Sequence, residues 1–152
     1  MSTPLRKPLI ALIAVAALVA PAFAIVDDAR SFAIEAALPW LEGKDGAAAP
    51  FAVRDAWWSG DSKVKEPKII RHQMFKRNEY WFWAATDDLE GTISIAVYDD
   101  EGKLVKSVER FNRSHTAGVK VVPETTGTYY IRVVVESATT PIAHWAVVYG
   151  YR

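Results

Sequence analysis

The chain has 152 residues, of which 51% are hydrophobic, 18 are basic and 18 are acidic, and it contains no cysteine. This length suits one domain that can bury a substantial core. The balanced charge gives no electrostatic argument for binding nucleic acid or an anionic membrane surface, and the absence of cysteine excludes disulfides and a cysteine-linked lipid anchor.

The amino-terminal segment has the three parts of a secretory signal peptide. Arg6 and Lys7 precede an apolar run from Leu9 to Ala20, and Ala22-Phe23-Ala24 supplies small residues at a cleavage site. The apolar run is shorter than the roughly 20 residues that span a bilayer. We therefore predict that residues 1–24 are removed and that the protein is exported, to the periplasm or outside the cell, with no membrane anchor after cleavage.

Residues 25–50 are expected to form an amphipathic helix and a linker. Alanine and aromatic residues recur at helical spacing up to Trp40, and charged residues oppose them. Regular helix is predicted from Asp27 to Ala37, because Pro39 disfavours a helical conformation in the residue before it. The polar side is acidic, which favours docking against the domain over binding to lipid. Glycine and proline mark residues 42–50 as a linker.

Residues 51–152 are expected to form one all-β domain. Phe51–Trp58 is either a first strand or an irregular covering segment, and Ser59–Pro67 resembles a loop. Asp99–Gly102 is predicted to be a hairpin turn, with Leu104–Phe111 returning from it. Seven or eight short strands with turn residues between them predict an antiparallel β-sandwich. The other predicted strands are Ile69–Phe75, Tyr80–Ala85, Thr92–Tyr98, Ala117–Val122, Gly127–Val135 and His144–Tyr151.

Gly127–Val135 is the longest run of β-branched and aromatic residues, and such residues suit a pleated, half-buried surface. Because side chains alternate along a strand, Tyr129, Ile131, Val133 and Val135 are predicted to share the core face. The other face is mixed and carries Thr128, Tyr130, Arg132 and Val134.

Three segments resemble the bacterial pre-peptidase C-terminal domain, a small jelly-roll-like β-sandwich that accompanies secreted enzymes. They are Asn78–Trp83 (Asn-Glu-Tyr-Trp-Phe-Trp), Ile93–Gly102 with its Tyr-Asp-Asp-Glu-Gly ending, and Pro123–Val133 with Gly-Thr-Tyr-Tyr after a proline-containing turn. The similar part runs over about residues 69–152. The resemblance implies a jelly-roll-like sandwich that acts as a non-catalytic accessory module, although no peptidase precedes it in this chain.

The strand Tyr80–Ala85 is aromatic on both faces, whereas a strand with one solvated face should alternate. If Tyr80 and Phe82 face the core, Trp81 and Trp83 face outward and need a cover. We expect the amino-terminal segment to supply it through Phe32, Trp40, Trp57 and Trp58. The alternative is an exposed ligand-binding platform of Trp57, Trp58, Trp81 and Trp83 for a sugar, peptide or protein.

Histidines and serines form no recognisable catalytic or metal motif. His72, His115 and His144 are expected beside different strands, as satisfied or exposed side chains, and a three-histidine metal site is the minor alternative. Ser59 lacks the strand-to-helix elbow that activates a serine nucleophile.

Carboxylates concentrate in two predicted turns, at Asp87, Asp88 and Glu90 and at Asp99 and Asp100. Aspartate is favoured in turns because it hydrogen-bonds its own backbone, and this is the preferred interpretation. Paired carboxylates for glycoside hydrolysis are less favoured. Calcium is a minor alternative, because its oxygen ligands are present but one strand places the two turns at opposite ends.

The sequence thus predicts an exported, non-enzymatic β-sandwich that serves as a binding or accessory module and needs no cofactor. Its expected partner is a protein or a polysaccharide. The alternatives are a carbohydrate-binding module that uses surface tryptophans, and a small secreted hydrolase.

Overall fold

The computed structural model describes residues 27–43 and 49–152, so the predicted signal peptide lies outside the described residues. The described part contains one helix, α1 (Asp28–Leu41), and eight strands. All strand pairs are antiparallel. The strands are β1 (Ala52–Lys63), β2 (Lys68–Met74), β3 (Tyr80–Thr86), β4 (Thr92–Tyr98), β5 (Glu109–Arg113), β6 (Thr116–Val121), β7 (Gly127–Ser137) and β8 (Ile142–Tyr151).

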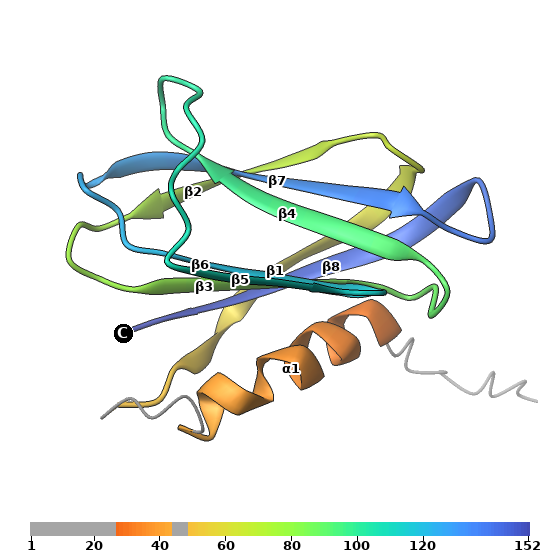
Figure 1. Ribbon diagram of the computed structural model, residues 1–152, viewed down its shortest axis with the longest axis horizontal. Coiled ribbons are helices and arrows are strands. Elements are labelled where there is room, and N and C mark those ends of the chain that lie inside the picture. Colours follow the sequence, from red (N-terminus) through yellow and green to blue (C-terminus); the bar gives the residue numbers. More distant parts are fainter. Residues whose placement is uncertain (1–26, 44–48) are drawn as a thin grey trace, which may run out of the picture.

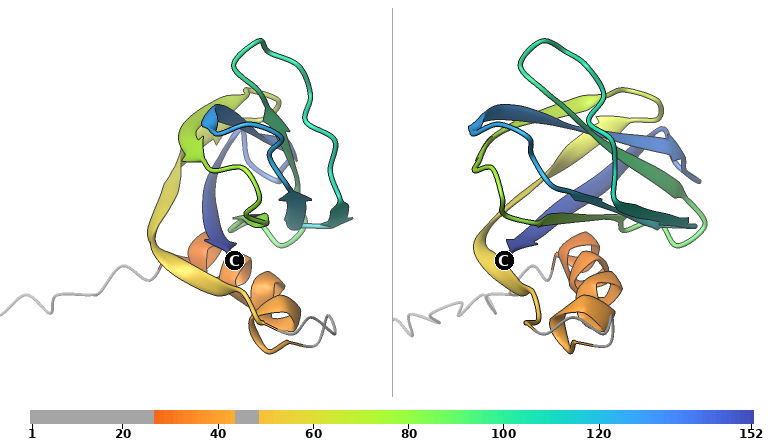
Figure 2. Two further views of the ribbon diagram at one scale, coloured as in Figure 1. Left: turned by 90° about the vertical axis from the view of Figure 1, so that its left-hand side faces the viewer. Right: turned by 60° about the vertical axis from the view of Figure 1, so that its left-hand side comes forward.

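The strands form two sheets that stack as an open sandwich, which confirms the predicted all-β fold (Figure 1). One sheet has five strands in the order β1-β8-β3-β6-β5, and the other has three in the order β2-β7-β4. Helix α1 lies along the outer face of the five-stranded sheet, on the side away from the three-stranded sheet (Figures 1 and 2). The molecule therefore has three layers, and the helix covers only one of its two outer sheet faces.

The core between the sheets follows the alternation of β7. Tyr129, Ile131, Val133 and Val135 are buried there, as predicted. From the facing sheet, β3 contributes Tyr80, Phe82 and Ala84 to the same cluster. Removing such side chains from water stabilises the fold by about 25 cal/mol for each Å² of apolar surface buried.

Strand β1 is longer than predicted, because it continues through residues that looked loop-like. Ser59 to Lys63 pair with β8 from Ala146 to Ile142. The backbone partner, rather than local composition, decides the conformation here.

The prediction that Leu104–Phe111 returns from the hairpin turn as a strand beside β4 is wrong. Gly102 has the positive φ expected of the turn, but only Leu104 bridges back to Tyr98, and Val105 donates to Val97 O. The chain then crosses to the other sheet, where β5 pairs with β6. In β5, Phe111 lies directly over Gly118 and packs on the helix side of the sheet, which ties this strand to the five-stranded sheet.

Helix α1 ends four residues later than predicted. Asp27 caps it by accepting a hydrogen bond from the Arg30 N–H, and Pro39 lies inside the last turn. Pro39 cannot donate to the Glu35 carbonyl, but both residues are exposed, so water can satisfy that oxygen. Burial of Trp40 offsets this local cost. In the described part of the chain no helix is long and apolar enough to cross a membrane.

Candidate functional site

Two of the predicted platform residues, Trp81 and Trp83, lie under α1. Both are fully buried, and their rings stack 5.6 Å apart. The Trp40 ring lies 4.4 Å from Trp81 and stacks on Phe111 at 5.5 Å, so one helix residue joins β3 to β5. The helix therefore supplies the expected internal cover. Neither Trp81 nor Trp83 is accessible to a ligand while α1 is in this position.

Trp57 and Trp58 lie elsewhere, so the four tryptophans do not form one surface. Trp57 is 37% exposed, and the guanidinium of Arg30 lies 5.0 Å from the centre of its ring. Trp58 points into the sandwich and contacts the rings of His72 and Tyr149 at 5.4 and 5.3 Å. The prediction that both residues would cover Trp81 and Trp83 is wrong, because consecutive residues of β1 face opposite sides of the sheet.

His144 is held between two carboxylates beside the start of α1. Its Nε2 lies 3.0 Å from Asp27 Oδ2 and its Nδ1 lies 2.8 Å from Asp61 Oδ1. Asp27 is the cap of α1, Asp61 belongs to β1 and His144 to β8. This Asp27–His144–Asp61 cluster joins the helix to two neighbouring strands of the sheet that it covers.

In this cluster the histidine and the carboxylates shift each other's pKa toward the charged forms. Burial alone would lower the pKa of His144, but hydrogen bonds and charges from Asp27 and Asp61 raise it above the ordinary 6.5. Burial would raise the pKa of Asp27, yet the hydrogen bonds from His144 and the Arg30 N–H lower it below the ordinary 3.8. Both nitrogens of His144 are engaged, so neither is available as a general base.

The other histidines have packing roles. His72 lies among Trp58, Phe82 and Tyr149, and burial lowers its pKa. His115, in the turn between β5 and β6, meets the ring of Phe32 edge-on at 5.0 Å. Across residues 27–43 and 49–152, no group of three or more His, Asp or Glu side chains is arranged to hold a metal ion.

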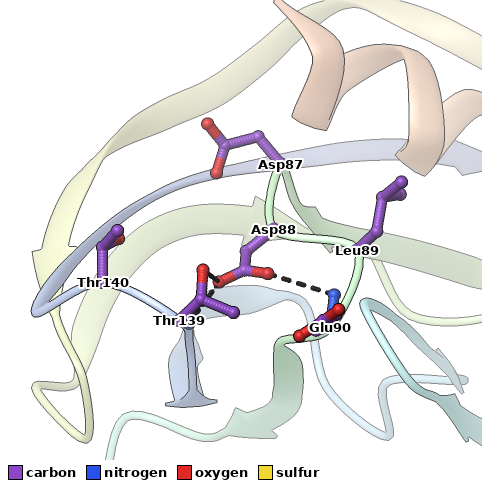
Figure 3. A pocket seen from close by; sticks show the side chains of 6 residues that line it. All are labelled: Asp87, Asp88, Leu89, Glu90, Thr139 and Thr140. Carbon is purple, nitrogen blue, oxygen red and sulfur yellow. Dashed lines mark hydrogen bonds between the residues drawn. The ribbon is translucent and has the colours of Figure 1, made fainter.

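The loop between β3 and β4 borders a surface pocket of about 480 Å³ with the loop between β7 and β8 (Figure 3). Asp88 joins the two loops: Oδ1 accepts from Glu90 N at 3.0 Å, and Oδ2 accepts from the Thr139 backbone N–H and from its hydroxyl at 2.8 Å. These bonds lower the pKa of Asp88, that from the Thr139 N–H most. The local bond from Glu90 N agrees with the predicted turn role of Asp88, and the bonds from Thr139 additionally fasten the two loops together. Asp87 points away from this network (Figure 3).

The other large depression, of about 430 Å³, lies on the outer face of the three-stranded sheet. Tyr98 of β4 and Tyr130 of β7 are direct partners across the sheet, so their side chains share that face. Ile69 of β2, which is 58% exposed, lines the depression with them. Three apolar or aromatic side chains thus meet at a surface that α1 does not cover.

Charged residues surround these three side chains. Arg132 of β7 is paired with Ile69 of β2 and with Ala96 of β4, on the same face as the Tyr98–Tyr130 pair and two residue pairs away from it. Asp99, Asp100 and Gly102 come from the turn after β4, and the connection that begins there rises beyond the three-stranded sheet (Figures 1 and 2). Asp99 Oδ1 accepts from the N–H groups of Glu101 and Lys103 at 3.0 and 2.8 Å, which fixes the shape of the turn.

The sequence did not identify Tyr98, Tyr130 or Arg132 as site residues. A signal was present, because alternation places Tyr130 on the mixed face of its strand, and the same rule places Tyr98 on the face opposite Val97. The missing information was that β4 and β7 are neighbours in register, which local patterns do not specify. Comparison of the chain with protein-family models and with curated proteins gives no match.

Proposed function

We propose that the protein is an exported, non-catalytic binding module whose ligand site is the outer face of the three-stranded sheet. The observation that carries the proposal is the depression around Tyr98, Tyr130 and Ile69. In this depression two half-buried tyrosines and an exposed isoleucine meet on a sheet face that α1 does not cover. Its volume of about 430 Å³ falls within the usual size of ligand pockets, roughly 300–1,000 Å³.

The composition of the face supports a binding role over a structural one. A sheet face that only needs solvation carries polar side chains, and Thr128 and Ser94 follow that rule. Ile69, Tyr98 and Tyr130 depart from it at adjoining positions. Apolar side chains that gather on an exposed surface, with polar groups around them, mark interaction sites.

The chemistry of the polar clusters supports a non-catalytic role. Both ring nitrogens of His144 are hydrogen-bonded to carboxylates, and both carboxylate oxygens of Asp88 accept hydrogen bonds within the loops. A hydrolase needs a base or nucleophile that is free to reach the substrate. The hydrolase alternative is therefore the less favoured one.

The proposed setting follows from the amino-terminal signal. After removal of residues 1–24 the chain would act in the periplasm or outside the cell. Its partner is a protein or a polysaccharide rather than nucleic acid, since basic residues do not outnumber acidic ones. The resemblance to the accessory domain of secreted enzymes agrees with this role. Amino-terminal sequencing of the exported protein should begin at Ile25.

Nuclear magnetic resonance titration of the labelled domain tests the proposal directly. A panel of defined oligosaccharides and peptides should contain ligands that shift amide signals of β2, β7 and β4 together, and should leave the α1 side unshifted. A parallel assay on chromogenic esters and glycosides should show no turnover. Ligands that shift only other surfaces, a panel without any shift on this face, or turnover abolished by His144→Gln would contradict the proposal.

A further inference from the structure

The depression has an apolar floor. Tyr98 and Tyr130 are opposed across β4 and β7, and Tyr130 is in turn opposed by Arg71 of β2. Ile69 lies two residue pairs further along, on the same face and opposite Arg132. On one face of a sheet directly opposed neighbours lie about 5 Å apart and diagonal ones, such as Ile69 and Tyr130, about 7–8 Å apart, still within reach of long side chains. Two phenol rings and one aliphatic side chain thus form a contiguous surface about the size of a single ring-shaped ligand.

The charged groups at the edge of this floor have opposite signs. Arg132 and Asp100 line the depression, the exposed Arg71 stands opposite Tyr130 on the same face, and none of the three forms an ion pair with another described residue. Asp99 adds a second carboxylate, held in place by the Glu101 and Lys103 N–H groups. The site therefore offers hydrogen-bond donors from Arg132 and the tyrosines, and acceptors from Asp99 and Asp100.

This mixture of charges restricts the ligand. An anionic ligand centred on the floor would approach Asp99 and Asp100, and a cationic one would approach Arg132 and Arg71, so each would meet a like charge. A neutral ligand with many hydroxyl groups meets no such repulsion, because a hydroxyl both donates and accepts. Its apolar face must also be flat enough to lie on tyrosine rings. A pyranose ring has these properties, with C–H groups on its face and hydroxyls around its edge.

We propose that the depression binds a neutral hexopyranose unit of an oligosaccharide or polysaccharide, an inference that rests on the binding role proposed above. The sugar ring lies on Tyr98 and Tyr130, while Arg132 and Asp100 hydrogen-bond to its hydroxyls. The open, shallow form of the site suits one unit within a longer chain, because the neighbouring units can extend past it. The site differs from the tryptophan platform considered from the sequence, because Trp81 and Trp83 lie on the opposite side of the sandwich.

The test is a titration of the labelled protein with six-unit oligosaccharides of known charge. The neutral probes are maltohexaose, cellohexaose, laminarihexaose and mannohexaose. The charged probes are hexagalacturonate and the chitosan hexamer. At least one neutral probe should shift the amide signals of β4, β7 and residues 99–102, and should bind more tightly than either charged probe. Absence of such shifts with every neutral probe, or tighter binding of a charged one, would overturn the inference.

Variants assign the contacts. Tyr98→Ala and Tyr130→Ala should each weaken binding about tenfold or more, because each removes a large apolar contact. Tyr98→Phe should retain most of the affinity, and Arg132→Gln and Asp100→Asn should weaken binding several-fold by removing one charged hydrogen bond each. Leu89→Ala, an exposed position in the β3–β4 loop, is the matched control and should bind normally. Unchanged affinity in both tyrosine-to-alanine variants would also overturn the inference.

Peptide probes distinguish failure of this inference from failure of the proposed function. If peptides shift the amides of this face and saccharides do not, the face is a binding site but its ligand is not a sugar. If saccharides bind and shift only other surfaces, both the inference and the proposed location of the ligand site are wrong.

Discussion

The two outer faces of the sandwich differ in their side chains and in what lies over them. On the five-stranded sheet, β3 presents Trp81 and Trp83, and α1 buries them completely. On the three-stranded sheet, β7 presents Tyr130 and Arg132 between Thr128 and Val134, and α1 is on the far side of the molecule (Figure 1). The fold needs a helix over the first face because continuous aromatic surface cannot be left in water.

The difference indicates which apolar residues on the outer faces of the sheets are explained by packing and which are not. On the covered face every large ring contacts another, from Trp40 to Trp81, Trp83 and Phe111. On the open face Ile69 and the tyrosines have no covering layer, so the core does not account for them. Variants on the two faces should therefore differ in what they change: stability on the covered face and ligand binding on the open one.

The largest expected effect is on the covered face. Trp83→Ala should lower the free energy of unfolding by about 3–5 kcal/mol, because it leaves a large cavity under α1. Trp83→Phe should cost less, since it keeps a ring against Trp81 and removes an indole N–H that has no acceptor among the described residues. Urea unfolding of the two variants measures the difference. Equal effects of Trp83→Ala and Tyr98→Ala would remove the contrast between the faces.

A smaller effect is expected where β5 joins the covered face. Gly118→Ala should destabilise by about 1–3 kcal/mol, because its Cβ would overlap the ring of Phe111 and displace that ring from Trp40. Gly127→Ala is the matched control, since nothing lies near the position of its Cβ. Thermal unfolding followed by calorimetry should show a lower unfolding temperature for Gly118→Ala than for Gly127→Ala. Similar stability of both variants would show that Phe111 is not fixed against the helix.

The cluster that joins α1 to the sheet should make stability depend on pH. Because the pKa of His144 is raised on folding, its contribution to stability is fully present below the ordinary value of 6.5 and is lost as the pH rises through the raised pKa. Because the pKa of Asp27 is lowered, its contribution is fully present above the ordinary value of 3.8 and is lost as the pH falls through the lowered pKa. His144→Gln should therefore cost most between those two values, by about 1 kcal/mol, and less in alkaline solution.

Asp27→Asn is the matched variant for this pH dependence. Asparagine caps a helix about as well as aspartate but carries no charge, so the variant separates capping from the ion pair. Urea unfolding at pH 5.5 and 8.5 gives the comparison. A cost of His144→Gln that does not change with pH would contradict the ion-pair account.

The smallest effect is expected on the open face. Tyr98→Ala should change the free energy of unfolding by only about 0.5 kcal/mol, the usual range for surface substitutions, because its side chain lies on the outer side of β4. Urea unfolding checks this value. A loss of several kcal/mol would show that the tyrosine supports the core and is not kept for a ligand.

The sequence predicted the features that depend on local alternation. The core face of β7 and the opposed faces of β3 follow from period-2 patterns, and the need for a cover followed from aromatic residues on both sides of β3. The fold class followed in the same way from strand spacing. Trp40 was among the residues expected over Trp81 because the helix had an apolar stripe without another partner.

Features that depend on distant partners were not predictable. Ser59–Lys63 is a strand only because β8 pairs with it, and β5 leaves the β4 hairpin because Phe111 fits over Gly118. His144 meets Asp61 and Asp27 across 83 and 117 positions of sequence. The Tyr98–Tyr130 pair likewise required knowledge of strand order. Local sequence carries propensity and alternation, but not pairing.

Hydroxyl-radical footprinting with mass spectrometry tests the contrast between the faces most directly, because one reaction reports on both. Indole reacts at least as readily as phenol, so intrinsic reactivity does not favour the expected outcome, and Trp57, at 37% exposure, is an internal standard. We predict that Tyr98, Tyr130 and Trp57 are oxidised while Trp81 and Trp83 are protected. Oxidation of Trp81 and Trp83 at the rate of Trp57 would show that α1 does not close this face, and would contradict the account.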